Sequence, residues 1–271
     1  MTEFTSLIYK TEGRVAHLIL NRPHRLNAID SAMPRDIEAA VQKANDDDGV
    51  HAIVLSGAGK GFCGGYDLVE FAEKEDEPHT QEMPWDPMID YKFMKANTDA
   101  FSSLWRSYKP TIAKIHGPAF GGAVGLISCC DIAIAIPSST FCFSEVKIGL
   151  IPATIAPYII QTIGVSHAQC YFLSAETIDA QQALNLGLLH KVVDREELDL
   201  AIEKTIQNLL ANSPKAMGAI KALIKEIQYQ PINEDVQHAT CKRLAEIRMS
   251  DQGQEGLSAF LEKRHPSWQS N

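Results

Sequence analysis

The amino-acid sequence predicts an α/β fold, and three of its features carry that prediction. Short apolar runs rich in β-branched residues alternate with helical patterns through the first part of the chain. Two of these runs end in glycine-rich turns, and from Pro152 onward the pattern is helical throughout. Continuous apolar runs separated by helices are typical of buried parallel strands joined by crossovers.

The predicted elements follow one another in a regular order. Five segments have the composition of buried strands: Val15–Leu20, His51–Ser56, Thr111–His116, Asp131–Ile136 and Thr140–Phe143. Helices are predicted between them, over Ser31–Asn45, Asn97–Ser107 and Gly121–Cys130. The second part adds the helices Ile155–Ile163, Ser166–Leu173, Ala180–Leu186, Glu196–Ala211, Pro214–Gln228, Glu234–Met249 and Gln254–Lys263. Pro214 is well placed at a helix start, because its fixed φ suits the first turn.

The two glycine turns expose backbone N–H groups. One turn joins the strand Thr111–His116 to the helix that opens at Gly121, and the other, Gly57–Leu68, follows the strand His51–Ser56. The free N–H groups and positive dipole end of a helix N-terminus favour an oxygen that gains negative charge, which is the logic of an oxyanion hole. The turn that leads to Gly121 lacks the spacing of a phosphate-binding fingerprint. Close packing is the alternative role for such glycines.

Taken together, the two turns resemble a known family. Phe62-Cys63-Gly64-Gly65-Tyr66-Asp67-Leu68 is similar to the F-[SC]-x-G-x-D-[LI] motif of the enoyl-CoA hydratase/isomerase (crotonase) family, and Gly117–Asp131 is similar to its second glycine motif. Further matches are Asn21-Arg22-Pro23, Asn27-Ala28, Gly149-Leu150-Ile151-Pro152 and the segment Gly256–Pro266. The resemblance covers essentially the whole chain.

The resemblance implies an architecture and a set of site residues. The expected fold is a core of repeated ββα turns, residues 1–195, followed by a helical region, residues 196–271, that packs a homotrimer or a dimer of trimers. The backbone N–H groups of Tyr66 and Gly122 are expected to bind the thioester oxygen. Lys60, and with less support Arg25 and Lys263, are expected to contact coenzyme A, unless they are ordinary surface cations. The residues expected to bind substrate or coenzyme A are Arg25, Ala28, Lys60, Gly64, Gly65, Asp67, Leu68, Gly121, Gly125 and Lys263.

Glu145 is the candidate general acid/base. It follows the strand Thr140–Phe143 in an apolar setting, where desolvation should raise the pKa of a carboxyl toward neutral pH. Its position matches the second catalytic glutamate of the family, which moves the proton at the α-carbon. The alternative is an ordinary glutamate paired with Lys147 or with a helix end.

Gly125 departs from the pattern of hydratases with two catalytic glutamates, which carry the first glutamate at this position. A missing side chain here predicts a single-carboxylate site with room for a bulkier acyl group. The surrounding sequence is similar to a subgroup that acts on branched dicarboxylic acyl-CoAs, the methylglutaconyl-CoA hydratases of leucine breakdown and the isohexenylglutaconyl-CoA hydratases of terpene breakdown.

The sequence therefore predicts a lyase that adds water to a branched 2-enoyl-CoA, with 3-methylglutaconyl-CoA as the first choice. An enoyl-CoA isomerase and an acyl-CoA hydrolase of the same fold remain as alternatives, as does a non-catalytic acyl-CoA-binding protein. Coenzyme A enters as part of the substrate, and no permanently bound cofactor and no metal are expected.

Composition and charge limit the partners and the compartment that are expected for the protein. The net charge of −9 and the lack of a Lys/Arg-rich tract argue against a nucleic-acid partner. The N-terminus lacks the apolar run of a signal peptide, and no run in the sequence has the length of a membrane span, so a cytoplasmic protein without a membrane partner is expected. The six cysteines lack metal-ligand spacing and are interpreted as reduced core thiols, Cys63 included.

One segment resists the pattern. Glu70 to Asp90 holds eight carboxylates, three prolines and a single lysine, so no regular buried element is expected there. It is either an acidic surface loop or a lid over the acyl chain, in which Trp85, Met88 and Tyr91 would be the closing residues.

Overall fold

The computed structural model describes residues 4–73 and 87–269, and its centre is a six-stranded mixed sheet with the order β1-β2-β3-β4-β6-β9. β1 and β2 form an antiparallel hairpin, and every later strand joins in parallel. A small second sheet has the order β5-β7-β8. The strands are β1 (Leu7–Glu12), β2 (Val15–Leu20), β3 (Ala52–Gly57), β4 (Thr111–Ile115), β5 (Ala119–Phe120), β6 (Ile132–Ala135), β7 (Thr140–Cys142), β8 (Ile178–Asp179) and β9 (Lys191–Val192).

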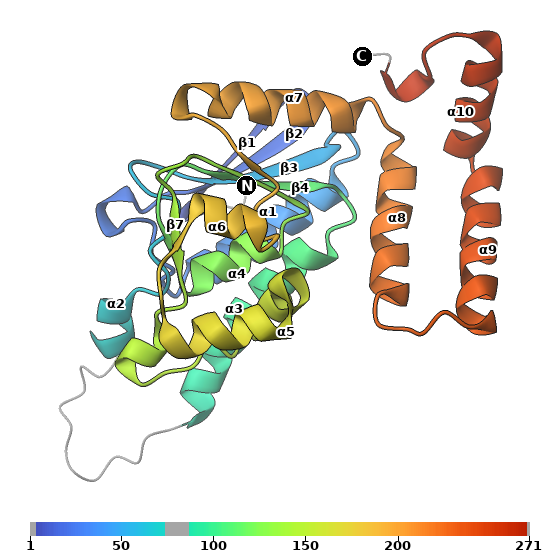
Figure 1. Ribbon diagram of the computed structural model, residues 1–271. Coiled ribbons are helices and arrows are strands. Elements are labelled where there is room, and N and C mark those ends of the chain that lie inside the picture. The colour runs from blue at the N-terminus through green and yellow to red at the C-terminus, as the bar shows by residue number, and fades with distance from the viewer. Residues whose placement is uncertain (1–3, 74–86, 270–271) are drawn as a thin grey trace.

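Helices cover both faces of the large sheet, which explains why its strands are continuous apolar runs. Alternate side chains point to opposite faces, so Ile53 and Leu55 join the larger core while Val54 packs with Ile202 on α7. Figure 1 shows α7 across one face and α1, α3 and α4 on the other. These helices are α1 (Met33–Asp46), α2 (Leu68–Glu73), α3 (Pro87–Arg106), α4 (Gly122–Ser128), α5 (Ala156–Ser174), α6 (Ala180–Asn185) and α7 (Leu198–Leu210).

The last three helices form a separate layer beside the core (Figure 1). They are α8 (Pro214–Ile227), α9 (Glu234–Met249) and α10 (Asp251–Glu262). Their apolar side chains are largely open to solvent: Phe260 is 81% exposed and Leu261 79%. α7, which lies within the predicted region 196–271, packs on the sheet, and α8 is the first helix of the separate layer. The division of the chain into a core and an oligomerisation region stays a prediction.

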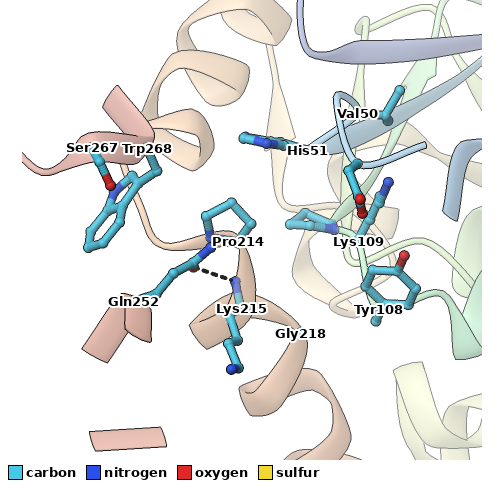
Figure 2. A pocket seen from close by; sticks show the side chains of 12 residues that line it. Val50, His51, Tyr108, Lys109, Pro214, Lys215, Gly218, Gln252, Ser267 and Trp268 are labelled. Carbon is cyan, nitrogen blue, oxygen red and sulfur yellow. Dashed lines mark hydrogen bonds between the residues drawn. The ribbon is translucent and has the colours of Figure 1, made fainter. Parts of the chain in front are cut away.

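A hollow of about 650 Å³ lies between this layer and the core (Figure 2). His51, Tyr108 and Lys109 face it from the core, and Lys215 and Trp268 face it from the C-terminal layer. The backbone N–H of Lys215 donates to Oε1 of Gln252 at 3.0 Å beside it. None of the residues predicted to form the active site lines this hollow.

Most predicted elements are confirmed, with shifts of a few residues at their ends. The two helices predicted over residues 155–173 form one element with a break at Gly164, whose φ of 78° is not helical. The expectation that residues 70–90 lack regular structure is wrong at both ends, because α2 runs to Glu73 and α3 begins at Pro87. Trp85 and the side chain of Met88 lie outside the described residues, and Tyr91 is 61% exposed.

No helix in the described part of the chain is long and apolar enough to cross a membrane. The cysteine prediction holds for the four buried thiols Cys63, Cys129, Cys130 and Cys142, but it is wrong for Cys170 and Cys241, which are exposed. Burial raises the pKa of the Cys63 thiol to about 12, so it is protonated and a poor nucleophile at neutral pH.

Candidate active site

The two glycine turns meet, as the sequence predicts they can. Cys63 and Ala119 form a parallel bridge in which Cys63 N–H donates to Pro118 O at 3.3 Å and Phe120 N–H donates to Cys63 O at 3.2 Å. Gly65 has φ of +89°, and a Cβ added there would lie 2.7 Å from Phe120 O. Only glycine therefore lets the first turn lie this close to the second.

Asn27 fixes the first turn through its side chain. Its side chain is fully buried, and its amide nitrogen donates to three carbonyl oxygens of the turn, those of Ala58, Gly61 and Phe62, at 2.8, 3.0 and 3.2 Å. Its amide oxygen accepts the N–H of Arg22 at 2.9 Å. The backbone groups of a glycine-rich turn thus find their partners in one side chain, which satisfies them without a regular strand.

Arg22 anchors the end of the same turn. Its guanidinium contacts Asp67 Oδ2 at 2.9 Å and Asp30 Oδ2 at 3.0 Å, and it donates to Ala28 O at 2.7 Å. Burial alone would raise the pKa of the Asp67 carboxyl, but the hydrogen bond from Arg22 and its charge hold that pKa below the usual range. Asp67 thus remains ionised and serves as a structural anchor for the turn, where it also accepts the N–H of Glu70 in α2.

The bridge between Ile29 and Tyr66 leaves one backbone donor unused. Ile29 N–H donates to Gly65 O at 2.7 Å, and Asp67 N–H donates to Ile29 O at 2.9 Å, so Tyr66 turns its own N–H away from this contact. Gly122 is the first residue of α4, where N–H groups have no partner within the helix. Within residues 4–73 and 87–269, no acceptor takes the N–H of Tyr66 or of Gly122.

Glu145 lies against the start of α4. A short 3₁₀ helix, Glu145–Ile148, follows β7 and turns the side chain back toward Gly121, where an added Cβ would be 3.0 Å from Glu145 Oε1. The residue is 8% exposed, and its Oε2 atom is buried without a hydrogen-bond partner in the described part of the chain. Burial raises the pKa of this carboxyl, as a proton-transfer group requires.

The described part of the structure lacks the Lys147 ion pair of the alternative interpretation, although Glu145 does stand in the first turn of the 3₁₀ helix Glu145–Ile148. Among the described residues, no ion pair joins Glu145 to Lys147, whose ammonium lies 4.0 Å from the Cys142 sulfur instead. A carboxylate that is buried, unpaired and next to free N–H groups is costly for stability, which is typical of a functional group.

Tyr66 brings a side chain to the same place. Its ring lies over Gly122, since a Cβ there would be 3.3 Å from Tyr66 Cζ, and it packs near the Phe93 ring with centroids 6.2 Å apart. The phenol oxygen and the Thr154 hydroxyl are hydrogen-bonded at 3.0 Å. Burial raises the pKa of Tyr66 to about 12, and the charge of Glu145 adds to that rise, so the phenol keeps its proton.

Gly125 does not open the pocket, and this part of the sequence interpretation is wrong. A Cβ at Gly125 would lie 2.2 Å from Ile155 Cγ2 and 3.5 Å from Phe101 Cε1. The space that a side chain at this position would enter is filled by Ile155, at the contact between α4 and α5. The room predicted for a bulkier acyl group is therefore taken up by the protein itself.

The structure brings some of the predicted coenzyme A contacts together and separates one. Arg25 and Lys60 are both exposed and lie on adjoining turns, because a Cβ at Gly59 would lie 2.8 Å from Pro23. Gly64 packs beside Leu26 in the same region, and Leu68 is partly open to solvent at the start of α2. Lys263 ends α10, at the opposite end of the molecule from α2 (Figure 1).

Sequence reasoning did not assign a function to three residues of this arrangement. Asn27 and Arg22 position the first turn, and Thr154 contacts Tyr66. Asn27 and Arg22 stand inside motifs that carry the family resemblance, and this position was the signal by which the sequence could have singled them out. Thr154 gives no such local signal, because its partner lies 88 residues earlier in the chain.

Comparison with known proteins agrees with this architecture. The family model of enoyl-CoA hydratase/isomerase matches residues 10–271. The crystal structure of an enoyl-CoA hydratase from Shewanella pealeana superposes with a TM-score of 0.91 at 37% identity, covering 98% of this chain and 97% of that one. An enoyl-CoA hydratase/isomerase (crotonase) from Legionella pneumophila has a TM-score of 0.89 at 36% identity, covering 98% and 100%. The enoyl-CoA hydratase AFT6-1 of Alternaria alternata is 39% identical over 216 residues, 79% of this chain and 68% of that protein.

The sheet, the two converging turns and the separate helical layer define a protein of the crotonase fold. The chain belongs to the enoyl-CoA hydratase/isomerase family.

Proposed function

We propose that this protein adds water to, or removes it from, a 2-enoyl-CoA thioester, with a branched acyl group as the preferred substrate. Relatives named enoyl-CoA hydratase support the general hydro-lyase reaction. The observation that carries the proposal is the position of Glu145, a buried carboxyl of raised pKa next to the helix that opens at Gly122.

In this proposal the thioester oxygen accepts the N–H groups of Tyr66 and Gly122. Both donors are already free and need no rearrangement, so they stabilise the enolate that forms when a nucleophile attacks the β-carbon. Loss of one such donor typically costs about 2.7–4 kcal/mol of transition-state stabilisation. A side chain at Gly122 would crowd the residues around this donor, because an added Cβ would lie 3.1 Å from Ile29 Cδ1 and 3.3 Å from Tyr66 Cζ.

Glu145 is proposed to move the proton. As a carboxylate it takes a proton from water while the water oxygen bonds to the β-carbon, and the π electrons of the alkene pass to the thioester oxygen. The enolate then collapses as the protonated Glu145 delivers a proton to the α-carbon, which regenerates the carboxylate. The net change is the addition of one water on one face of the double bond, and dehydration is the reverse.

The branched substrate, 3-methylglutaconyl-CoA as first choice, is the finer part of the proposal. It is supported by the likeness of the sequence around Gly125 and Glu145 to the branched-acyl subgroup, and no longer by room at Gly125. An enoyl-CoA isomerase is the second candidate, because a single carboxylate suffices to carry a proton between two carbons.

A panel of straight and branched enoyl-CoA esters tests these choices. Mass detection of an added or lost water would identify a hydratase, and a shifted double bond without water uptake would identify an isomerase. Release of free coenzyme A, measured with a thiol reagent, would point to a hydrolase. If no ester changes while a saturated acyl-CoA still binds, a non-catalytic acyl-CoA-binding protein is favoured, and Glu145 has no chemical role.

Coenzyme A is proposed to enter as part of the substrate, with its phosphates near Lys60 and Arg25. Replacing Lys60 by Ala should raise KM for the thioester about 2- to 5-fold, as expected for one solvent-exposed charge pair, and leave kcat unchanged. Added salt should reduce the difference between the two proteins. Lys204→Ala removes an exposed lysine from α7 and serves as the matched control. Equal KM values for all three proteins would contradict the assignment.

The exposed apolar side chains of α10 support the predicted homotrimer or dimer of trimers, in which residues 196–271 form the oligomerisation region. Lys263, which follows the last residue of α10 in the separate layer, is proposed to contact coenzyme A of a neighbouring subunit in such an assembly. Sedimentation analysis of the purified protein measures the oligomeric state directly.

A further inference from the structure

We propose that the hydroxyl pair of Tyr66 and Thr154 holds the reacting water against Glu145, in place of a second carboxylate. The inference rests on the proposed hydratase function and names the group that completes that site. It assigns Tyr66 two separate tasks: its backbone N–H contacts the thioester oxygen, and its phenol helps to position the water.

The first support is the place of the pair in the fold. The Tyr66 ring covers Gly122, whose N–H is free, and its phenol reaches Thr154 at 3.0 Å. Glu145 is close enough for its charge to act on the phenol. The Tyr66 side chain therefore lies between the proposed oxyanion site at Gly122 and the acid/base Glu145.

The second support is the pair of residues, Thr154 and Ile155, that lies beside Gly125, where other hydratases carry a glutamate. Ile155 fills that space with carbon, and the residue just before it, Thr154, presents a hydroxyl to Tyr66. The same dipeptide thus blocks a side chain at Gly125 and supplies a polar group nearby. Both Tyr66 and Thr154 are only partly buried, so a small molecule can reach them.

The third support is the hydrogen-bonding capacity that remains. In a hydroxyl pair, one O–H is used for the mutual bond, so the second O–H and the remaining lone pairs are free for a water. Oε2 of Glu145 is buried and has no partner in the described residues. A water that accepts from the free hydroxyl and donates to the carboxylate of Glu145, which is 8% exposed, would give both groups a partner.

Two reactions separate water positioning from loop support. Hydration of an enoyl-CoA needs the water, the N–H groups and Glu145. Exchange of the α-proton of a saturated acyl-CoA such as butyryl-CoA in D₂O needs only the N–H groups and Glu145: the carboxylate removes a proton from the α-carbon, exchanges it with solvent, and returns a deuteron to the enolate. A group that positions the reacting water acts on the first reaction alone.

The variants are Tyr66→Phe and Thr154→Val, each of which removes a hydroxyl and keeps the shape. Both leave the backbone N–H of residue 66 intact. We expect kcat for hydration to fall about 10- to 100-fold in each variant, the range for a lost hydrogen bond in a transition state, with KM nearly unchanged. The exchange rate should stay within about twofold of the wild type. Tyr158→Phe, which removes a phenol hydroxyl from α5 beside Phe101, is the control and should leave both rates unchanged.

Three outcomes would overturn the inference. Hydration and exchange that fall together would show that the pair only supports the turn. Unchanged hydration in both variants would show that the hydroxyls take no part. If the wild-type protein exchanges the α-proton but hydrates no enoyl-CoA, the proposed hydratase function itself fails, and this inference fails with it. Thermal unfolding shows whether each variant is folded. If Tyr66→Phe does not fold, Thr154→Val carries the test.

Discussion

Replacing Glu145 by Gln should abolish turnover and leave binding of the thioester intact. Gln keeps the shape of the side chain and cannot transfer a proton. Positioned general acid/base groups contribute about 10²- to 10⁴-fold, so kcat should fall by at least that factor while Kd for a saturated acyl-CoA stays the same. Asp67→Asn would not be a matched control, since Asp67 is paired with Arg22. Glu176→Gln, an exposed glutamate, is suitable and should have no effect.

The same substitution should stabilise the protein at neutral pH. Burial raises the pKa of Glu145 in the folded state, so the folded protein binds that proton more tightly than the unfolded chain does. The contribution of the protonated carboxyl is present below the ordinary pKa of a glutamate and is lost as pH rises through the raised pKa. The Tm of Glu145→Gln should therefore exceed that of the wild type at neutral pH, and the difference should shrink as pH falls toward about 4. A Tm difference that is constant with pH would contradict the cause assigned to this shift.

Replacing Gly125 by Ala should destabilise the protein by about 1–3 kcal/mol, although alanine is the better helix former. The added Cβ meets Ile155 Cγ2 at 2.2 Å, so α4 and α5 must move apart or Ile155 must leave its rotamer. Gly125→Glu should cost more, because it adds a charge at a buried position. Activity should fall as well, since Thr154 precedes the residue that is displaced. Denaturant unfolding and kcat for hydration measure the two effects.

A double-mutant cycle identifies the cause. Ile155→Ala alone should cost about 2–5 kcal/mol through the cavity that it leaves. In the double mutant the new methyl at position 125 enters space vacated by Ile155, so the combined loss should be smaller than the sum by about 0.5–3 kcal/mol. If the two changes in the free energy of unfolding simply add, glycine is required at position 125 for a reason other than the contact with Ile155.

Local patterns in the sequence predicted the buried strands and the amphipathic helices well, since burial on both faces requires a continuous apolar run. They missed β1, whose burial falls away toward Glu12, and the two-residue strands β5, β8 and β9, which exist only because a partner strand lies beside them. They also missed the first turns of α3. Acidic residues and prolines are typical of loops, but a proline at the first helical position is compatible with a helix.

The candidate site, like the fold, has features that the sequence predicts and features that it does not. Its glycines, Glu145 and the acidic anchor at Asp67 stand in turns that follow predicted strands, so their proximity could be inferred from the sequence. The contact between Tyr66 and Thr154 and the filling of the space at Gly125 depend on how α4, α5 and the first turn pack. Residues separated by many positions, such as Gly125 and Ile155, carry no local sign of that contact.

The turn that bears Tyr66 depends on the single amide group of Asn27. An Asn27→Asp substitution would turn this amide into an acid, and the three carbonyl oxygens that now accept its hydrogens would face a negative charge in a site without solvent. The turn would have to move away, and the N–H of Tyr66 would move with it. Such a substitution would inactivate the protein while every group that faces the substrate stayed chemically intact.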